Sequence, residues 1–253
     1  MPFDLQQRWD SYTGVWESVR FGLWHLLQIT LSSHWHNLHD QAFANFYTDV
    51  GPHFARFEEE QTPVPRLIGS ANGIILELGP GSGNQIPRFR SSAISKIYAV
   101  EPNAQFILIL VQRAKDHGLD EKYIVINAAL EDEEILATHR IVDGGIDTVV
   151  CMQVLCSVPD VDAAAKRIWM LLKPGGQLVY WEHQGSSDGV TRFVQRMWNL
   201  IRKPLMGGCH LDRDIEDAIM SAGAWEIVEM GRDGDDGYDL MPRYWGRLRK
   251  PVE

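Results

Sequence analysis

Short, mainly apolar runs follow one another through the centre of the chain, each ending in polar residues or glycine. The runs cover residues 74–77, 97–100, 123–127, 147–152 and 177–181. Their length is typical of buried strands, and between the last two runs Ala164, Ile168 and Leu171 recur at the spacing of one helix face. Strands that alternate with helices predict an α/β fold with a mostly parallel sheet, in which ligands bind at the carboxyl ends of the strands.

The first of these runs passes directly into a glycine-rich turn. Glu77 ends the run, and glycine then occupies the alternate positions Gly79, Gly81 and Gly83. Because glycine lacks a Cβ, the backbone can approach a ligand closely and can adopt positive φ angles. The dinucleotide fingerprint G-x-G-x-x-G would need a glycine where the chain has Asn84, and no Gly-Lys-Ser/Thr follows. The spacing therefore favours a nucleoside site and disfavours binding through phosphate groups.

A second acidic residue ends the next apolar run. Glu101 follows the run at 97–100, about 20 residues after the glycine-rich turn, where doubly wound folds place a carboxylate against ribose hydroxyls. A carboxylate can accept hydrogen bonds from both hydroxyls of the sugar. A solvated residue at a strand end is the alternative for Glu101, and more so for Glu77. The ends of the third and fourth runs should face the same crevice if the strands are parallel.

Three features, in this order, resemble the class I S-adenosylmethionine-dependent methyltransferases. They are the acidic-x-Gly-x-Gly-x-Gly loop from Glu77, the acidic strand end at Glu101 and the Lys-Pro-Gly-Gly turn at 173–176. More narrowly, further segments are similar to the methyltransferase-like seven family of small alkyl-thiol methyltransferases. These segments are residues 150–158, 181–183, 207–213 and 241–246. The resemblance covers roughly residues 40 to 250, and the chain departs from the family before residue 40 and in an acidic segment at 131–145.

The resemblance implies a Rossmann-like, doubly wound α/β fold. We expect a seven-stranded, mostly parallel sheet with the last strand antiparallel, in a single methyltransferase domain over residues 1–253. An N-terminal helical cap or lid should cover residues 1–60, and the cofactor-binding core should cover residues 66–253. The implied cofactor is S-adenosyl-L-methionine. The residues expected to bind it are Glu77, Gly79, Gly81, Gly83, Glu101, Pro102, Ala129, Leu130, Gln153 and Val154.

The implied reaction is methyl transfer to a small molecule, in which the protein mainly holds the nucleophile in line with the departing sulfur. A thiol acceptor has to be a thiolate, so it gains from a positive neighbour or a weak base. His183, after the fifth run, is the first candidate for that role and His210 is the second; the alternative for each is a buried structural histidine. The residues expected to line the substrate pocket are Tyr47, Cys156, Trp198 and Tyr244.

Sulfur is favoured as the acceptor by the narrow resemblance alone, because composition and spacing do not select sulfur over oxygen or nitrogen. An O- or N-methyltransferase of specialised (secondary) metabolism is the first alternative. The same fold can also serve as a pericyclase or cyclase that uses the cofactor only as a positive charge. A membrane-surface binding protein without turnover is the alternative from a different class.

Composition narrows the choice of partner and compartment. The chain has 253 residues and is 45% hydrophobic, and a domain of this size needs neither a disulfide nor a metal for stability. The net charge of −10, without any block of Lys or Arg, argues against a nucleic-acid substrate. Three cysteines without a framework spacing indicate a reducing compartment. We therefore expect a cytoplasmic protein that acts on a small molecule, as a monomer or a homodimer.

Two groups of histidines and cysteines raise the question of a metal site. The first group, His34, His36 and His39, is close together in the sequence. The second group could converge in space although its members are far apart in the chain: Cys156, His183, Cys209 and His210. Neither group shows C-x-x-C or H-E-x-x-H spacing, and a buried cysteine most often behaves as a small hydrophobe. We therefore expect no metal.

The N-terminal region predicts an amphipathic helix. Apolar residues recur at helical spacing from Trp16 to Leu31, and polar residues such as Arg20 and His25 interrupt them. The stretch is too short and too polar to cross a bilayer. A lid over the active site or a dimer contact is favoured over peripheral membrane contact, which usually involves more Lys and Arg. Aromatic residues between positions 43 and 57 are expected to belong to the core or to cover the cofactor.

Overall fold

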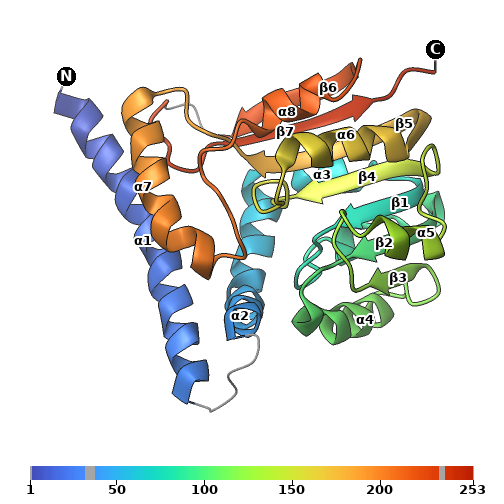
Figure 1. Ribbon diagram of the computed structural model, residues 1–253, viewed down its shortest axis with the longest axis horizontal. Coiled ribbons are helices and arrows are strands. Elements are labelled where there is room, and N and C mark those ends of the chain that lie inside the picture. The colour runs from blue at the N-terminus through green and yellow to red at the C-terminus, as the bar shows by residue number, and fades with distance from the viewer. Residues whose placement is uncertain (1, 32–37, 234–236, 253) are drawn as a thin grey trace.

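The computed structural model describes residues 2–31, 38–233 and 237–252, which form a sheet with helices on both faces (Figure 1). The strands are β1 (Gly73–Leu78), β2 (Ile94–Val100), β3 (Tyr123–Ile126), β4 (Ile146–Met152), β5 (Leu172–His183), β6 (Glu226–Asp233) and β7 (Arg243–Arg249). The α-helices are α1 (Pro2–Leu31), α2 (Leu38–Gln61), α3 (Val64–Ile68), α4 (Ile107–Asp116), α5 (Glu133–Thr138), α6 (Val161–Leu171), α7 (Gly189–Leu205) and α8 (Ile215–Ser221). Short 3₁₀ turns are η1 (Ile86–Arg88), η2 (Ser91–Ala93) and η3 (Ala104–Phe106).

The strand order of the sheet is β3-β2-β1-β4-β5-β7-β6. β1 pairs in parallel with both β2 and β4, and β5 continues the parallel set beside β4. β7 runs antiparallel to its two neighbours, β5 and β6. The predicted doubly wound, seven-stranded fold with an antiparallel last strand is therefore confirmed. β2 lies on one side of β1, and β4 lies on the other side, so the strand order reverses at β1. α/β folds bind ligands at the carboxyl ends of the strands where the strand order reverses.

Two apolar layers hold the sheet between its helices. In β1, Leu76 and Leu78 belong to the layer that includes residues of α5, α6 and α8, whereas Ile75 belongs to the opposite layer with α3 and α4. All three side chains are almost fully buried. Burial on both faces is typical of parallel strands covered by helices. The carboxyl ends of these strands therefore give the loops beyond them fixed positions.

The predicted turn at 173–176 lies inside the bounds of β5. Ile146 pairs with Leu172 but Thr148 pairs with Gln177, so the residues between them bulge out of the ladder with β4. Gly175 has a φ of +78°, in the left-handed region that favours glycine. The turn is thus present as a bulge, and β5 begins at Leu172 rather than at the predicted Gln177.

The N-terminal helix α1 begins at Pro2, well before the predicted pattern that starts at Trp16. It lies beside α7 and packs against α2 as well (Figure 1). Val15 and Val19 are buried on its inner side, and Arg8 pairs with Asp188, the N-cap of α7, at 2.7 Å. Among the residues with described positions, no helix is long and apolar enough to cross a membrane.

Candidate cofactor pocket and active site

A cavity of about 440 Å³ lies at the carboxyl ends of β1, β2 and β4. This volume falls within the usual range of small-molecule sites. The loops after these strands form most of its wall, and α2 contributes Phe43, Tyr47 and Phe54. No residue of α1 with a described position lines it, so α2 is the helix that covers this cavity. The predicted cap over residues 1–60 stays a prediction, and within that range it is α2 that supplies residues to the cavity.

Two asparagine side chains fix α2 to the loops of the cavity. Asn103, after β2, donates its side-chain N–H to the Asp40 carbonyl at 2.9 Å. Asn84, after the glycine-rich turn, donates to the Gly51 carbonyl at 3.3 Å. Both asparagines line the cavity. The helix that covers the pocket is thus held by hydrogen bonds to the loops beneath it.

The three glycines of the turn after β1 have positive φ angles but different surroundings. A Cβ on Gly79 would lie 2.9 Å from a Val154 methyl carbon, and one on Gly83 would lie 2.8 Å from Ile86 Cδ1. A Cβ on Gly81 would meet nothing within 4 Å. Gly79 and Gly81 line the cavity and Gly83 does not. The first and third glycines therefore permit close packing within the protein, and the middle one leaves room for a ligand beside the backbone.

Glu101 is held at the rim of this turn by two backbone hydrogen bonds. Its Oε2 accepts from Gly81 N at 2.9 Å and its Oε1 accepts from Asn103 N at 2.9 Å. Burial raises the pKa of Glu101, and the two backbone N–H groups oppose this shift. Each oxygen has a lone pair left for a ligand, because a carboxylate accepts up to about four hydrogen bonds.

Glu77 presents a carboxylate oxygen that has no partner. Its Oε2 accepts from the Tyr123 hydroxyl at 2.6 Å. Its Oε1 is buried and has no hydrogen-bond partner among the described residues, although Glu77 lines the cavity. Burial raises the pKa of Glu77 to about 7. A buried polar atom normally has a partner, so Oε1 indicates a place for a ligand donor.

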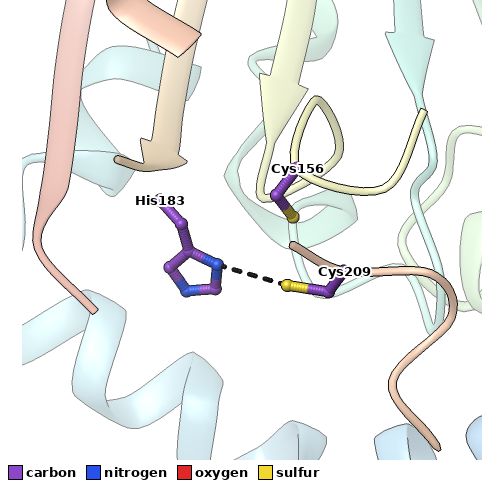
Figure 2. Close-up of side chains that lie close together, drawn as sticks. All are labelled: Cys156, His183 and Cys209. Carbon is purple, nitrogen blue, oxygen red and sulfur yellow. Dashed lines mark hydrogen bonds between the residues drawn. The ribbon is translucent and has the colours of Figure 1, made fainter. Parts of the chain in front are cut away.

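Three side chains with sulfur or imidazole groups converge beside the cavity (Figure 2). They come from the turn after β4, the end of β5 and the segment after α7. Cys156, His183 and Cys209 are all buried, and their donor atoms lie within 4.8 Å of one another. Cys209 Sγ lies 3.7 Å from His183 Nδ1. Gln153, which lines the cavity, accepts from the Cys156 thiol through its carbonyl at 3.7 Å and places Nε2 3.4 Å from His183 Nε2.

Charge is distributed unevenly over this cluster. The Cys156 thiol and the Arg202 guanidinium hold the pKa of Cys209 well below its usual range. Burial lowers the pKa of His183, so its imidazole is neutral at pH 7. Arg202 Nη2 donates to Cys209 Sγ at 3.9 Å. The Cys209 sulfur of the cluster thus lies between a buried guanidinium and an imidazole.

A sequence model of the family described as Methyltransferase domain matches residues 54–224. The matched region holds the glycine-rich turn, Glu101 and all three side chains of the cluster. The chain belongs to this methyltransferase family. Among curated relatives, thiol S-methyltransferase TMT1B of Rattus norvegicus is 34% identical over 163 residues, which cover 61% of this chain and 63% of the relative. The match therefore spans less than two thirds of that relative's length, and it supports the predicted resemblance to thiol methyltransferases.

Solved structures place the methyltransferase in the same fold. The [4+2]-cyclase SpnF has a TM-score of 0.58 at 16% identity, covering 85% of this chain and 97% of that one. The N-methyltransferase NodS from Bradyrhizobium japonicum WM9, solved with S-adenosyl-L-homocysteine, has a TM-score of 0.54 at 19% identity, covering 81% of this chain and 98% of NodS. At these identities the likeness shows the fold alone.

The methyltransferase brings nearly all of its predicted cofactor residues to one cavity. Those that line it are Glu77, Gly79, Gly81, Glu101, Pro102, Ala129, Leu130, Gln153 and Val154. Gly83 lies behind the turn. Asn103 was not predicted from the sequence. Asparagine two residues after a strand end is a turn signal, and in the structure the Asn103 side chain accepts a hydrogen bond from Gln105 N. The sequence also does not reveal that the backbone of Gln153, which lines the cavity, is strained, with a φ of +61°.

The predicted catalytic and substrate residues are more scattered. Tyr47 lines the cavity, whereas Cys156 and His183 lie behind its wall in the cluster. His210 is half-buried and contacts Cys156 only through a backbone hydrogen bond, at 2.9 Å. Trp198 packs its ring 6.2 Å from that of Trp16 on α1. Tyr244 lies in β7, paired with Glu182 of β5. Neither Trp198 nor Tyr244 lines this cavity.

The two histidine groups considered for a metal also differ. His34 and His36 lie outside the described residues. Cys156, His183 and Cys209 do converge, and the His210 ring is not part of that cluster.

Proposed function

We propose that this methyltransferase binds S-adenosylmethionine in the cavity and transfers its methyl group to the sulfur of a small thiol. One observation carries the proposal: Gln153 and Ser157, which line the glycine-rich cavity with its two buried carboxylates, contact the buried cluster of Cys156, His183 and Cys209. The cavity supplies a place for the methyl donor. The cluster supplies a place where sulfur chemistry can be assisted.

Three features of the cavity fit the cofactor. Gly81 leaves open space for a ligand beside the backbone. Glu101 has acceptor capacity left for the two ribose hydroxyls, and the unpaired Oε1 of Glu77 suits the ammonium group of the methionine part. Pro102 and Leu130 would contact the adenine through apolar surface. The residues present therefore fit S-adenosylmethionine.

The protein's task in this reaction is binding and alignment. The cofactor, when bound, supplies an activated methyl group on a positively charged sulfur. Phe43, Tyr47 and Phe54 of α2 form an aromatic wall that keeps water from the cavity. Holding the acceptor in line with the methyl carbon removes much of the entropy cost of bringing two molecules together. This lowers the activation free energy by several kcal/mol.

Sulfur is the proposed acceptor on two grounds. The curated relative is named a thiol S-methyltransferase, and a buried cation, Arg202, lies next to Cys209 of the cluster. A thiolate reacts far faster than a thiol, and nearby positive charge favours it. His183 as a general base stays a prediction. Its two ring nitrogens face Cys209 and Gln153, so a substrate proton reaches it only by way of one of these groups.

Glu101→Ala tests the cofactor half of the proposal. The variant is expected to bind S-adenosylmethionine and S-adenosylhomocysteine about 10- to 150-fold more weakly, because hydrogen bonds to a charged group are worth about 1.5–3 kcal/mol. Isothermal titration calorimetry measures both ligands. NAD and ATP should give no binding heat, since the turn lacks the phosphate-binding spacing.

The control for Glu101 is Glu131→Ala, which removes an exposed carboxylate from the same cavity rim. It should leave both affinities unchanged. As a check on the ligand side, Glu101→Ala should lose affinity for adenosine but not for 2′,3′-dideoxyadenosine. Tight NAD binding, or a Glu101→Ala variant with normal affinity, would contradict the assignment.

We further propose that α1 and α7 rest on a lipid surface. These adjacent helices expose many large apolar side chains, here called the α1–α7 face (Figure 1). Its members are Trp9, Trp16, Phe21, Leu23, Trp24, Leu27, Val190, Phe193, Met197, Leu200 and Ile201. Tryptophan favours the membrane interface. α7 also exposes Arg196 and Lys203 and carries no acidic residue, which suits anionic lipid headgroups despite the net charge of −10.

Vesicle binding tests the α1–α7 face. The double variant Phe193→Glu/Leu200→Glu should bind vesicles of phosphatidylcholine and phosphatidylserine at least about tenfold more weakly, because two apolar side chains no longer leave water. Leu108→Glu is the matched control, since Leu108 is 81% exposed but lies on α4. The lipid assignment would be contradicted if the wild-type protein did not bind vesicles. It would also be contradicted if the wild-type protein were a dimer and the double variant a monomer.

A further inference from the structure

The cluster of Cys156, His183 and Cys209 has the donor set of a metal site. Its donor atoms lie within 4.8 Å of one another, and Cys209 Sγ and His183 Nδ1 are 3.7 Å apart. Around a tetrahedral zinc ion, neighbouring sulfur and nitrogen donors are about 3.6 Å apart, given the usual bond lengths to zinc. Two cysteines and one histidine are a donor set that catalytic zinc sites use, with the fourth position left open.

The surroundings of the cluster also suit a metal with thiolate ligands. Arg202 is only 7% exposed, and no described carboxylate lies within ion-pair distance of it. Its Nη1 donates to Ser18 Oγ at 3.1 Å and its Nη2 donates to Cys209 Sγ at 3.9 Å. Hydrogen bonds to ligand sulfur of this kind, and a partner for the second nitrogen of a ligand histidine, are typical of the groups that support metal sites. The Gln153 side-chain amide lies 3.4 Å from His183 Nε2, and with its oxygen turned toward the ring it can accept the Nε2–H of a ligand histidine.

The open position of such a site adjoins the cavity. No fourth His, Cys, Asp or Glu joins the three among the residues with described positions. Two residues that line the cavity touch the cluster: Gln153 through the contacts above, and Ser157 through its Oγ, 3.6 Å from Cys156 Sγ. Val154, next in the chain, packs against Gly79 of the cofactor turn. A ligand at the fourth position would therefore lie beside the cavity.

We propose that Cys156, His183 and Cys209 bind a zinc ion whose fourth ligand is the sulfur of the acceptor thiol. The assignment of the fourth ligand rests on the proposed thiol methylation. The thiol releases its proton to water when its sulfur binds the metal, because a coordinated thiol is deprotonated. Its sulfur then forms a bond to the methyl carbon. The bond from that carbon to the sulfonium sulfur breaks with its electron pair left on the departing sulfur. The products are a methyl thioether and S-adenosylhomocysteine.

This arrangement gives His183 a different role from that of a general base. As a ligand through Nδ1 it holds the metal and takes no proton from the substrate. It also accounts for the orientation of the imidazole, whose Nδ1 faces Cys209 Sγ (Figure 2).

Metal analysis of the purified full-length protein tests the site without any assay of activity. Protein grown with zinc and purified with a phosphine reductant should carry about one zinc per chain by plasma mass spectrometry. Cys156→Ala and Cys209→Ala should each lower the zinc content at least tenfold. Cys151→Ala is the matched control, because Cys151 is equally buried, lies in β4 outside the cluster and should leave the zinc content unchanged.

Cobalt(II) substitution of the wild-type protein keeps the test decisive even if a cysteine variant fails to fold. The cobalt protein should show sulfur-to-cobalt charge-transfer absorption, and added 1-propanethiol should intensify it while 1-propanol leaves it unchanged. A charge-transfer absorption that does not change when the thiol is added would overturn the assignment of the fourth ligand. Wild-type protein that binds neither zinc nor cobalt, or that shows a Cys156–Cys209 disulfide in place of metal, would overturn the site itself.

Failure of this inference is distinguishable from failure of the proposed function. If protein stripped of metal by 1,10-phenanthroline still methylates thiols at the full rate, the zinc assignment is overturned and thiol methylation stands. If the metal binds and the cobalt spectrum responds to thiol but no methyl group is transferred, the site stands and the proposed function is overturned. Under the proposal, stripping should slow methyl transfer about 100-fold and added zinc should restore it.

Discussion

Gly79→Ala is expected to weaken S-adenosylmethionine binding by at least about 30-fold. Gly79 has a φ of +53°, a region that costs other residues roughly 1–2 kcal/mol. A Cβ there would also lie 2.9 and 3.0 Å from the two methyl carbons of Val154, and overpacking of this kind costs about 1–3 kcal/mol. Both residues line the cavity, so relief of the clash has to move one of its walls. About 2 kcal/mol of lost binding corresponds to roughly 30-fold.

Gly118→Ala separates backbone strain from the loss of a ligand wall. Gly118 has a φ of +66° in the turn after α4, and a Cβ there would meet nothing within 4 Å. It should lower the free energy of unfolding by about 1–2 kcal/mol and leave the affinity for S-adenosylmethionine unchanged. Calorimetric titration and denaturant unfolding of both variants give the two quantities. Equal affinity in the Gly79 and Gly118 variants would show that the turn does not contact the cofactor.

The cofactor half of the site could be predicted because its signals are local in sequence. Glu77, the three glycines and Glu101 lie at the ends of two neighbouring parallel strands, and strand ends can be recognised without knowing how helices pack. The alternation of strands and helices also predicts that the sheet is mostly parallel. The contribution of α2 is less local, since Phe43 and Phe54 reach the cavity through tertiary contacts of the helix, among them the hydrogen bonds from Asn84 and Asn103.

The acceptor half could be predicted less well because it depends on tertiary orientation. Trp198 lies on the side of α7 that meets α1, and no residue of α7 lines the cavity, which the sequence pattern does not reveal. Tyr244 pairs with Glu182 in the sheet, so its position follows from the register of β7. The convergence of Cys156, His183 and Cys209 joins segments far apart in the chain. Their types suggested that it could occur, and only the fold brings the donor atoms together.

A thiol is expected to accept the methyl group at least about 1000-fold faster than an alcohol of the same chain length. A measurable fraction of an alkyl thiol is ionised near neutral pH, whereas an alkyl alcohol is not, and thiolate is intrinsically the stronger nucleophile. The buried Arg202 guanidinium next to Cys209 favours negatively charged sulfur in the cluster behind the cavity. A site built for oxygen would instead need a general base in contact with the substrate. The one histidine of the cluster, His183, faces Cys209 and Gln153.

The most direct measurement is transfer of a labelled methyl group from S-adenosylmethionine to matched acceptors. 1-Propanethiol, 1-propanol, 1-propylamine and phenol are supplied one at a time below saturation, and kcat/KM is taken from the initial rate of labelled product. The account predicts labelled methyl propyl sulfide from the thiol, with the alcohol, amine and phenol at least about 1000-fold slower. Turnover of phenol or propylamine at a rate equal to or above that of the thiol would contradict sulfur as the acceptor.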